Sequence, residues 1–286
     1  MNNILDEIKI KAKALHKKIV LCEGEDNRVV KAASDAAKEG LAEIVLLGNK
    51  AEIKAANPDV DLTGVTIVDP LTSPRLAEYN AKLCELRASK GMTPEQAAKL
   101  LTDGTYFGAM MLKMGEVDGL VSGACHSTAN TLRPGLQIIK TAKGVSSVSS
   151  FNLMICPPQG NQYCPDGLVV FADCGLNPTY TSEGLADCAI ATAKSAREIA
   201  GIDPKVAMLS FSTKGSAKHD NVTLVAEAVK IAKEKEPGLK IDGELQFDAA
   251  IVPSVGEFKA PGSAVAGHAN VFIFPDLQAG NIGYKI

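Results

Sequence analysis

The chain has 286 residues, of which 30 are Lys or Arg and 33 are Asp or Glu, so its formal net charge is −3 at pH 7. At about 150 residues per domain, this length predicts two domains that can each bury a core. The balanced charge excludes a general nucleic-acid binder, and no apolar run approaches the ~20 residues that span a bilayer. Because Lys9, Lys11 and Lys13 interrupt the N-terminal apolar pattern, we expect no signal peptide and a cytoplasmic location.

Cysteine and histidine spacing gives no sign of a metal site or of a disulfide framework. The seven cysteines are few and scattered, and no two of them have C-x-x-C spacing. The four histidines lie far apart, and no H-E-x-x-H occurs. We therefore expect no bound metal. The absence of Trp also removes the usual stacking platforms for single-stranded nucleic acid.

In the first half, short β-branched runs alternate with amphipathic segments. Strands are expected at residues 18–22, 42–47, 65–68 and 118–122, and helices at 27–38 and 128–140. The stretch 73–114 is helix-rich, with a helix start at Thr93-Pro94-Glu95 and a break at Asp103-Gly104. This alternation predicts βαβ units, a mostly parallel sheet and right-handed crossovers.

A Ser- and Gly-rich stretch at 144–150 is the candidate boundary, which gives domains at 1–147 and 148–286. Beyond it, strands are expected at 151–156, 168–172, 205–210, 239–242 and 270–274, and helices at 182–200 and 221–235. The loop 157–167 resembles a hairpin connection, so the second domain should contain a mixed sheet. A new element starts at residue 277 and the chain stops within it, which predicts that a C-terminal segment is missing.

The loop at 122–131 has the composition of an anion-binding turn. It is rich in Gly, Ser and Thr, follows an expected strand and opens an expected helix. Backbone N–H groups at a helix start attract anions, and ligands bind at this edge of parallel sheets. Ser127 and Thr128 would add hydroxyl groups, and Arg133 a guanidinium suited to phosphate or carboxylate. A helix capped by Ser127 or Thr128, with Arg133 solvated, is an equally compatible structural alternative.

A second loop, at 210–218, has similar chemistry. Ser212, Thr213, Lys214 and Gly215 follow an expected strand and precede an expected helix. The order of residues is not that of a Walker A loop, and no G-x-G-x-x-G follows a strand. Two such loops, one in each half, predict a cleft between the domains that binds a phosphorylated or strongly anionic ligand.

Other chemically active side chains fit structural roles better. Glu23, Glu25 and Asp26 follow the first strand and are candidate catalytic carboxylates, but acidic residues there are typical of a helix start. Cys125 is a candidate nucleophile and His126 a candidate acid or base; without a matched partner, an inert thiol and a loop-filling imidazole are favoured. No G-x-S-x-G is present, so an α/β-hydrolase triad is not supported.

A series of short strings runs in order along essentially the whole chain: VDGLVSGA (117–124), TLRP (131–134), LSFSTKGSAK (209–218), IDGELQ (241–246), DAAIVP (248–253), ANVFIFPDL (269–277) and GNIGYK (280–285). Together they resemble the phosphate acetyltransferase (phosphotransacetylase) family, with phosphate butyryltransferases as near relatives. The resemblance implies reversible acetyl transfer, in which acetyl-CoA and phosphate give acetyl phosphate and CoA. It implies direct attack of the CoA thiol in a ternary complex, with a carboxylate as base and cationic groups on the leaving phosphate.

The resemblance also implies an architecture and a setting. The fold would comprise two α/β domains with a central cleft, as in isocitrate and isopropylmalate dehydrogenases. The protein would be a cytoplasmic homodimer of acetate metabolism, with CoA as substrate and no metal or redox cofactor. A catalytically impaired CoA- or phosphate-binding module is the alternative from another class. A dehydrogenase of the same architecture is disfavoured, because its metal-binding aspartates and cofactor loop are missing.

Site residues follow from the same resemblance. Arg87 and Arg133 fall on arginines implicated in CoA or phosphate binding. The remaining expected substrate-binding residues are Ser127, Thr128, Ser212, Thr213, Lys214 and Tyr284. Family members continue beyond the position of Ile286 with an N-D-L-S-R-G motif and an Asp taken as the thiol base. None of the 286 residues can therefore be assigned as the general base, and this form is expected to be a fragment with impaired transfer.

Overall fold

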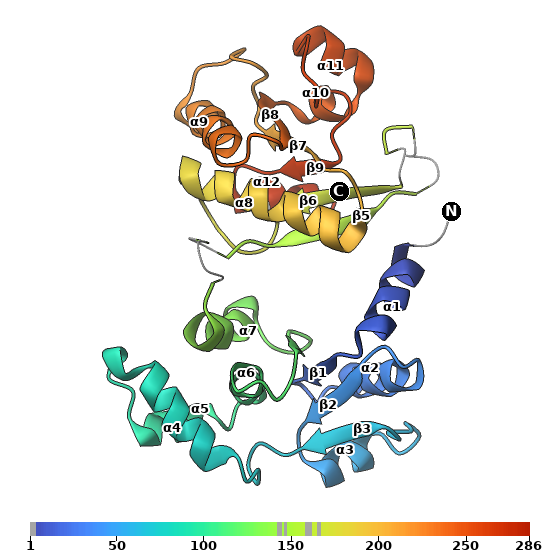
Figure 1. Cartoon of the computed structure of the whole chain (residues 1–286), viewed down its shortest axis with the longest axis vertical. Coiled ribbons are helices and arrows are strands. Elements are labelled where there is room, and N and C mark those ends of the chain that lie inside the picture. Colours follow the sequence, from blue (N-terminus) through green and yellow to red (C-terminus); the bar gives the residue numbers. More distant parts are fainter. Residues whose placement is uncertain (1–3, 142–144, 146–147, 158–161, 165–166) are drawn as a thin grey trace. The chain divides into compact units, whose positions relative to one another are not determined.

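The computed structural model describes residues 4–141, 145, 148–157, 162–164 and 167–286. The chain divides into two compact units, Met1–Lys140 and Thr141–Ile286. Each unit contains one sheet flanked by helices (Figure 1), so the α/β class expected from the alternating pattern is confirmed. The expected boundary at residue 147 lies outside the described residues.

The first unit is built on a parallel sheet with the strand order β3-β2-β1-β4. These strands span β1 Lys18–Leu21, β2 Glu43–Leu47, β3 Val65–Val68 and β4 Gly119–Val121. The helices are α1 Ile4–Leu15, α2 Asn27–Lys38, α3 Lys50–Ala56, α4 Leu76–Leu86, α5 Pro94–Leu100, α6 Gly104–Lys113 and α7 Thr128–Pro134. Because β1 lies between β2 and β4, its carboxyl end meets that of β4 at one edge of the sheet.

Local capping explains where several of these helices begin. Asp26 accepts a hydrogen bond from the backbone N–H of Arg28 at the start of α2, and Asp103 caps α6. Thr93 forms a capping box with Gln96 at the start of α5, as its Thr-Pro-Glu signal predicted. The helices α1 and α3 were not predicted from the sequence. In α1, closely spaced lysines interrupt the helical periodicity of the apolar residues, and α3 is only seven residues long, too short to show such a periodicity.

Alternate strand residues face two apolar clusters on opposite sides of this sheet. Val20 and Val45 pack into one cluster, to which α4, α5 and α6 contribute. Leu21 and Ile44 pack into the other, which α2 and α3 cover. The helix α6 is almost wholly buried. It approaches β1 closely at Gly108, where a Cβ would lie 2.7 Å from Cys22 Sγ.

The second unit contains a mixed sheet with the strand order β5-β6-β9-β7-β8. Its strands span β5 Phe151–Ile155, β6 Leu168–Ala172, β7 Lys205–Leu209, β8 Lys240–Leu245 and β9 Val271–Ile273. The pair β5–β6 is antiparallel, so the predicted hairpin is confirmed, and the other pairs are parallel. The helices are α8 Ser182–Ser195, α9 Asp220–Lys235, α10 Phe247–Ile251, α11 Pro253–Lys259 and α12 Leu277–Gly283.

A disulfide joins Cys156 and Cys164, both of which follow the end of β5 on the hairpin connection. Their spacing gave no reason to expect a pair. The antiparallel return of the chain brings their Cα atoms to 6.6 Å, a distance that disulfides span. Part of the connection (158–161 and 165–166) lies outside the described residues.

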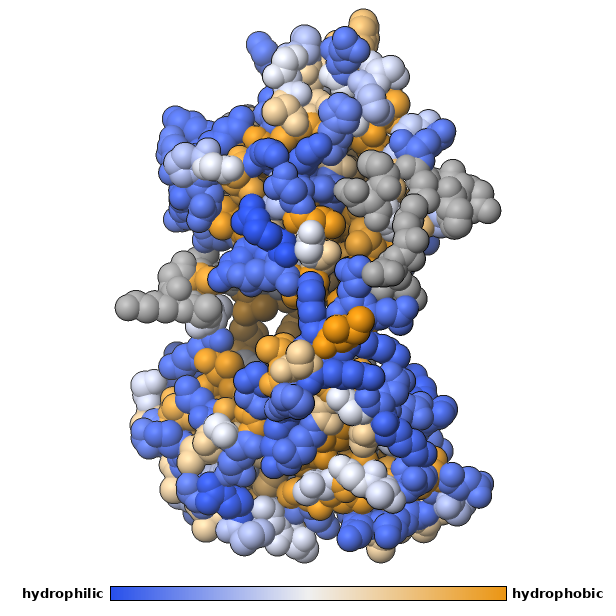
Figure 2. Space-filling model, turned by 45° about the vertical axis from the view of Figure 1, so that its right-hand side comes forward, coloured by the Kyte–Doolittle hydropathy of each residue, from blue (hydrophilic) through white to orange (hydrophobic). Residues whose placement is uncertain are grey.

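On the face shown in Figure 2, both units carry polar side chains with apolar ones among them. Within the described residues, no helix combines the length and the apolar character that crossing a membrane requires. The predicted helices at 128–140 and 182–200 each begin where expected and end in a π-helical turn, at Gly135–Ile139 and Ala196–Ala200. Pro134 lies inside the first of these helices and does not end it.

Candidate functional site

The loop between β4 and α7 lies at the carboxyl edge of the first sheet, as the sequence indicated. Ser127 is the N-cap of α7, and its hydroxyl accepts a hydrogen bond from the N–H of Asn130 at 3.3 Å. Thr128 is the first residue of the helix, and both side chains are exposed. The capping role considered for Ser127 is therefore present, and the Thr128 hydroxyl lies on the surface beside it.

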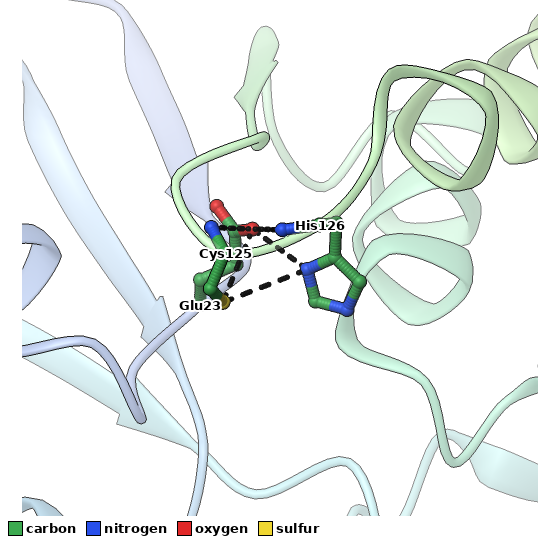
Figure 3. Close-up of side chains that lie close together, drawn as sticks. All are labelled: Glu23, Cys125 and His126. Carbon is green, nitrogen blue, oxygen red and sulfur yellow. Dashed lines mark hydrogen bonds and ion pairs between the residues drawn. The ribbon is translucent and has the colours of Figure 1, made fainter.

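The amide groups of this loop are already occupied by a carboxylate of the chain itself (Figure 3). Glu23 follows β1 and is only 1% exposed. Its Oε2 accepts from the N–H groups of Gly123 and Ala124, each at 2.8 Å. Its Oε1 accepts from those of Cys125 at 3.0 Å and His126 at 3.2 Å. These four amides therefore bind Glu23 and not a ligand anion in this structure, and Glu23 does not have the helix-start role favoured for it. The reason is that β1 and β4 are neighbours and end at the same edge.

The electrostatics of this cluster follow from its hydrogen bonds. Burial would raise the pKa of Glu23, but the hydrogen bonds from His126 and the loop amides outweigh it and hold that pKa at about 2. The Nδ1 of His126 lies 2.7 Å from Glu23 Oε1, and this contact raises the pKa of His126. Burial and the nearby Glu23 and Glu25 carboxylates raise the pKa of the Cys125 thiol to about 12. Cys125 is thus a protonated thiol at neutral pH and a poor nucleophile.

The same three side chains are the group in the described part that comes nearest to a metal-ligand set. One ligand-type atom from each of Glu23, Cys125 and His126 lies within 4.8 Å of the others. A metal would require the thiolate and a free carboxylate lone pair. Here the two oxygens of Glu23 already accept four backbone N–H groups. The arrangement fits a hydrogen-bonded loop better than a cation site.

Arg87 and Arg133 belong to the first unit and lie around one buried tyrosine. Arg87 follows α4 and its Nε is buried without a hydrogen-bond partner, whereas Arg133 is exposed on α7. Burial raises the pKa of Tyr106, and the positive charges of Arg133 and Arg87 oppose that shift. The Tyr106 hydroxyl donates to Oε1 of Gln137 at 3.0 Å.

These two guanidiniums differ from the other arginines of this unit in their charge partners. Among the described residues, neither Arg87 nor Arg133 forms an ion pair, whereas the other two arginines of this unit do. The sequence did not indicate Tyr106 or Gln137, because Tyr106 lies in an apolar helix and Gln137 in a segment without a motif.

In the second unit, the loop after β7 also surrounds a carboxylate. Ser212 and Thr213 are buried. Ser212 Oγ donates to Oε1 of Glu244 at 3.0 Å, and the N–H of Gly215 donates to the same oxygen at 2.6 Å. Thr213 Oγ1 accepts from the N–H of Gln246 at 2.9 Å. Both hydroxyls, which were expected to contact substrate, serve the loop itself in this arrangement.

Lys214 pairs with a buried carboxylate of the neighbouring strand β8. Its Nζ lies 2.5 Å from Oδ1 of Asp242 and donates to the carbonyl of Gly243 at 3.1 Å. Asp242 also contacts Lys233 at 3.3 Å and accepts from Ser263 Oγ at 2.5 Å. These hydrogen bonds and the Lys214 charge hold the pKa of Asp242 low against its burial. The side chain of Lys214 is 39% exposed, so its ammonium is shared between this pair and solvent.

Tyr284 follows α12 and packs against the apolar core of the second unit. The Lys285 ammonium lies 5.0 Å from the centre of its ring. The start of α12 was expected at residue 277 and is found there, with Asp276 as its N-cap. Thus Arg87, Arg133, Ser127 and Thr128 lie in the first unit, and Ser212, Thr213, Lys214 and Tyr284 lie in the second.

Comparison with known proteins gives consistent results over the whole length. The family model described as "Phosphate acetyl/butaryl transferase" matches residues 3–286. A phosphate acetyltransferase of Thermoanaerobacterium thermosaccharolyticum is 52% identical over 99% of this chain and 86% of its own length. One from Clostridium acetobutylicum is 54% identical over 96% of this chain and 83% of its own length.

Solved structures agree. A phosphotransacetylase from Streptococcus pyogenes matches with a TM-score of 0.92 and 46% identity, over 99% of this chain and 84% of that one. A branched-chain phosphotransacylase from Enterococcus faecalis V583 shares the fold, with a TM-score of 0.64 at 15% identity over 94% of this chain and 83% of that one. The chain therefore belongs to the phosphate acetyl/butaryl transferase family of acyltransferases.

Proposed function

We propose that this acyltransferase catalyses reversible transfer of an acetyl group between CoA and inorganic phosphate. Relatives named phosphate acetyltransferase are 52–54% identical to it over nearly the whole chain. The structural observation that carries the proposal is the pair of guanidiniums, Arg87 and Arg133, which have no carboxylate partner among the described residues. CoA, phosphate and acetyl phosphate are all anions, and planar guanidinium groups bind phosphate through two parallel N–H donors.

The residues that we assign to substrate binding differ in whether their polar groups already have hydrogen-bond partners within the chain. Arg87, Arg133, Ser127 and Thr128 present a charge or an exposed hydroxyl. Ser212, Thr213 and Lys214 would have to share or exchange their internal partners. For Tyr284 we assign a contact through the part of its ring that is not buried. Arg87 and Arg133 are consequently the residues on which the proposal is best tested.

In the proposed reaction, the sulfur of CoA attacks the carbonyl carbon of acetyl phosphate. A C–S bond forms, the C–O bond to phosphate breaks, and the thiol proton passes to a base. Arg87 and Arg133 would stabilise the charge that develops on the leaving phosphate. Glu23 is a poor choice for the base, since its pKa is about 2 and the loop amides occupy its oxygens.

The proposal includes a setting for the enzyme: a homodimer of the cytoplasm that serves acetate metabolism. The resemblance to the family supports these three points, and sedimentation of the purified protein tests the dimer. Butyryl transfer is the alternative reaction within the family. The naming of the relatives near 50% identity favours acetyl over butyryl.

The direct test is the ultraviolet absorbance of the thioester formed from CoA and either acetyl phosphate or butyryl phosphate. Faster turnover of acetyl phosphate supports the proposal. Faster turnover of butyryl phosphate shifts the assignment to the butyryl branch of the family. Calorimetric titration with CoA, on a form extended to the length of the relatives, separates the remaining cases. CoA binding without turnover in that form indicates a binding module, and neither binding nor turnover refutes the function.

A further inference from the structure

We propose that Glu23 is a positioning residue, whose buried carboxylate holds the loop 123–126 in the one conformation that presents Ser127, Thr128 and Arg133 to the anionic substrates. This inference rests on the proposed function, because it assigns Glu23 a part in binding the same substrates. Glu23 itself would touch neither substrate nor the reacting atoms.

The loop forms a nest, a concave run of backbone N–H groups that binds an anion, and the anion bound here is the carboxylate of Glu23. The N–H groups of residues 123–126 all point at the carboxylate of Glu23, at 2.8–3.2 Å. Consecutive N–H groups that converge in this way usually surround a bound anion. Here the anion belongs to the chain and is 1% exposed, so the loop holds its shape before substrate arrives. Such preorganisation removes an ordering cost from binding and from the transition state.

A second contact holds the opposite side of the loop. Nη2 of Arg28 donates to the carbonyl of Ala124 at 2.7 Å, while the same guanidinium pairs with Asp26 at 2.6 Å. The loop is thus held through its amides by Glu23 and through a carbonyl by Arg28. Gly123 has φ +113°, which side chains other than glycine rarely adopt. The next residue after the loop is Ser127, the cap of the helix that carries Arg133.

The pKa of His126 depends on its contact with Glu23, so the titration of His126 can be used to monitor that contact. Its ring nitrogen Nδ1 faces the Glu23 carboxylate (Figure 3), at 2.7 Å from Oε1. The His126 side chain is 25% exposed. The acidic groups that act on it are Glu23, Glu25 and Asp103, and the thiol of Cys125 lies 3.7 Å from Nδ1. Of these acidic groups, Glu23 contributes the hydrogen bond that raises the pKa of His126 most. Removal of the Glu23 charge should therefore lower the titration midpoint of this imidazole.

The test compares Glu23→Gln with Glu43→Gln, which makes the same chemical change on an exposed side chain at the amino end of β2, outside the cluster around Glu23. In Glu23→Gln, an NH₂ group would face part of the N–H nest, so the loop should lose its fixed shape. We expect kcat/KM for CoA and for acetyl phosphate to fall at least tenfold, mainly through KM, and the NMR titration of His126 to move towards about 6.5. Glu43→Gln should change kcat/KM by no more than about twofold.

A second variant, Gly123→Ala, tests the same proposal if the Glu23→Gln protein does not fold. Gly123→Ala leaves the carboxylate in place but strains the loop at an exposed position, so it should raise both KM values in a protein that still folds, with a melting temperature a few degrees below that of the parent. Unchanged KM values in Gly123→Ala, or in a folded Glu23→Gln protein, overturn the role of Glu23. A parent protein that neither binds CoA nor forms acetyl-CoA overturns the proposed function instead.

Discussion

Replacement of Arg133 by alanine should weaken substrate use without weakening the fold. Arg133 is exposed, and no ion pair within the described residues involves it. Its truncation leaves no buried group without a partner, so the free energy of unfolding should change by no more than ~0.5 kcal/mol. A charge-assisted hydrogen bond to phosphate contributes ~1.5–3 kcal/mol. Its loss corresponds to a decrease of roughly tenfold to a hundredfold in kcat/KM.

The assay uses the protein at the full length of its relatives and measures kcat/KM for CoA and for acetyl phosphate at low and at moderate ionic strength, together with urea unfolding. Arg197→Ala is the matched control, because it removes the same charge from an exposed arginine of the second unit. Arg133→Lys separates charge from shape: it keeps the charge but loses the two-pronged donor geometry, and should recover only part of the activity. The difference between Arg133→Ala and its parent should shrink as salt screens the site. Unchanged kcat/KM for both substrates would refute the assignment.

Three further predictions concern stability. Asp173 accepts hydrogen bonds from three backbone amides and from the side chains of Ser150, Asn177 and Tyr180. Asp173→Asn should therefore lower the free energy of unfolding, measured in urea, by about 3 kcal/mol. A decrease below about 1 kcal/mol contradicts this prediction. The folded-state pKa of Glu23, about 2, lies below its ordinary 4.5, so its stabilisation is complete above about pH 4.5 and is lost as the pH falls towards 2. This amounts to roughly 3 kcal/mol, and acid unfolding of Glu23→Gln should lack it. In Gly108→Ala the new Cβ would lie 2.7 Å from Cys22 Sγ. The free energy of unfolding should therefore fall by ~1–3 kcal/mol. A variant as stable as the parent would show that α6 can move away from β1.

Short-range patterns were enough to place most elements. The helix predicted at 27–38 and the strand predicted at 65–68 have those bounds in the structure, because a capping Asp26 and a run of β-branched residues act within a few positions. The antiparallel β5–β6 hairpin also follows from two neighbouring segments. The helices α10 and α11, at 247–251 and 253–259, were missed because they are too short to show a period.

The sequence by itself also determined the chemistry of the candidate site: two polar loops after strands, and the arginines at positions 87 and 133. Only the tertiary structure decided which groups these loops bind. Glu23 lies 100 residues before Gly123, and Glu244 lies 32 residues after Ser212. Each carboxylate reaches its loop because strand order places β1 beside β4 and β8 beside β7. Composition reveals a turn rich in hydrogen-bond donors, but the acceptor is set by which strand lies next to it, and that depends on the packing of the whole sheet.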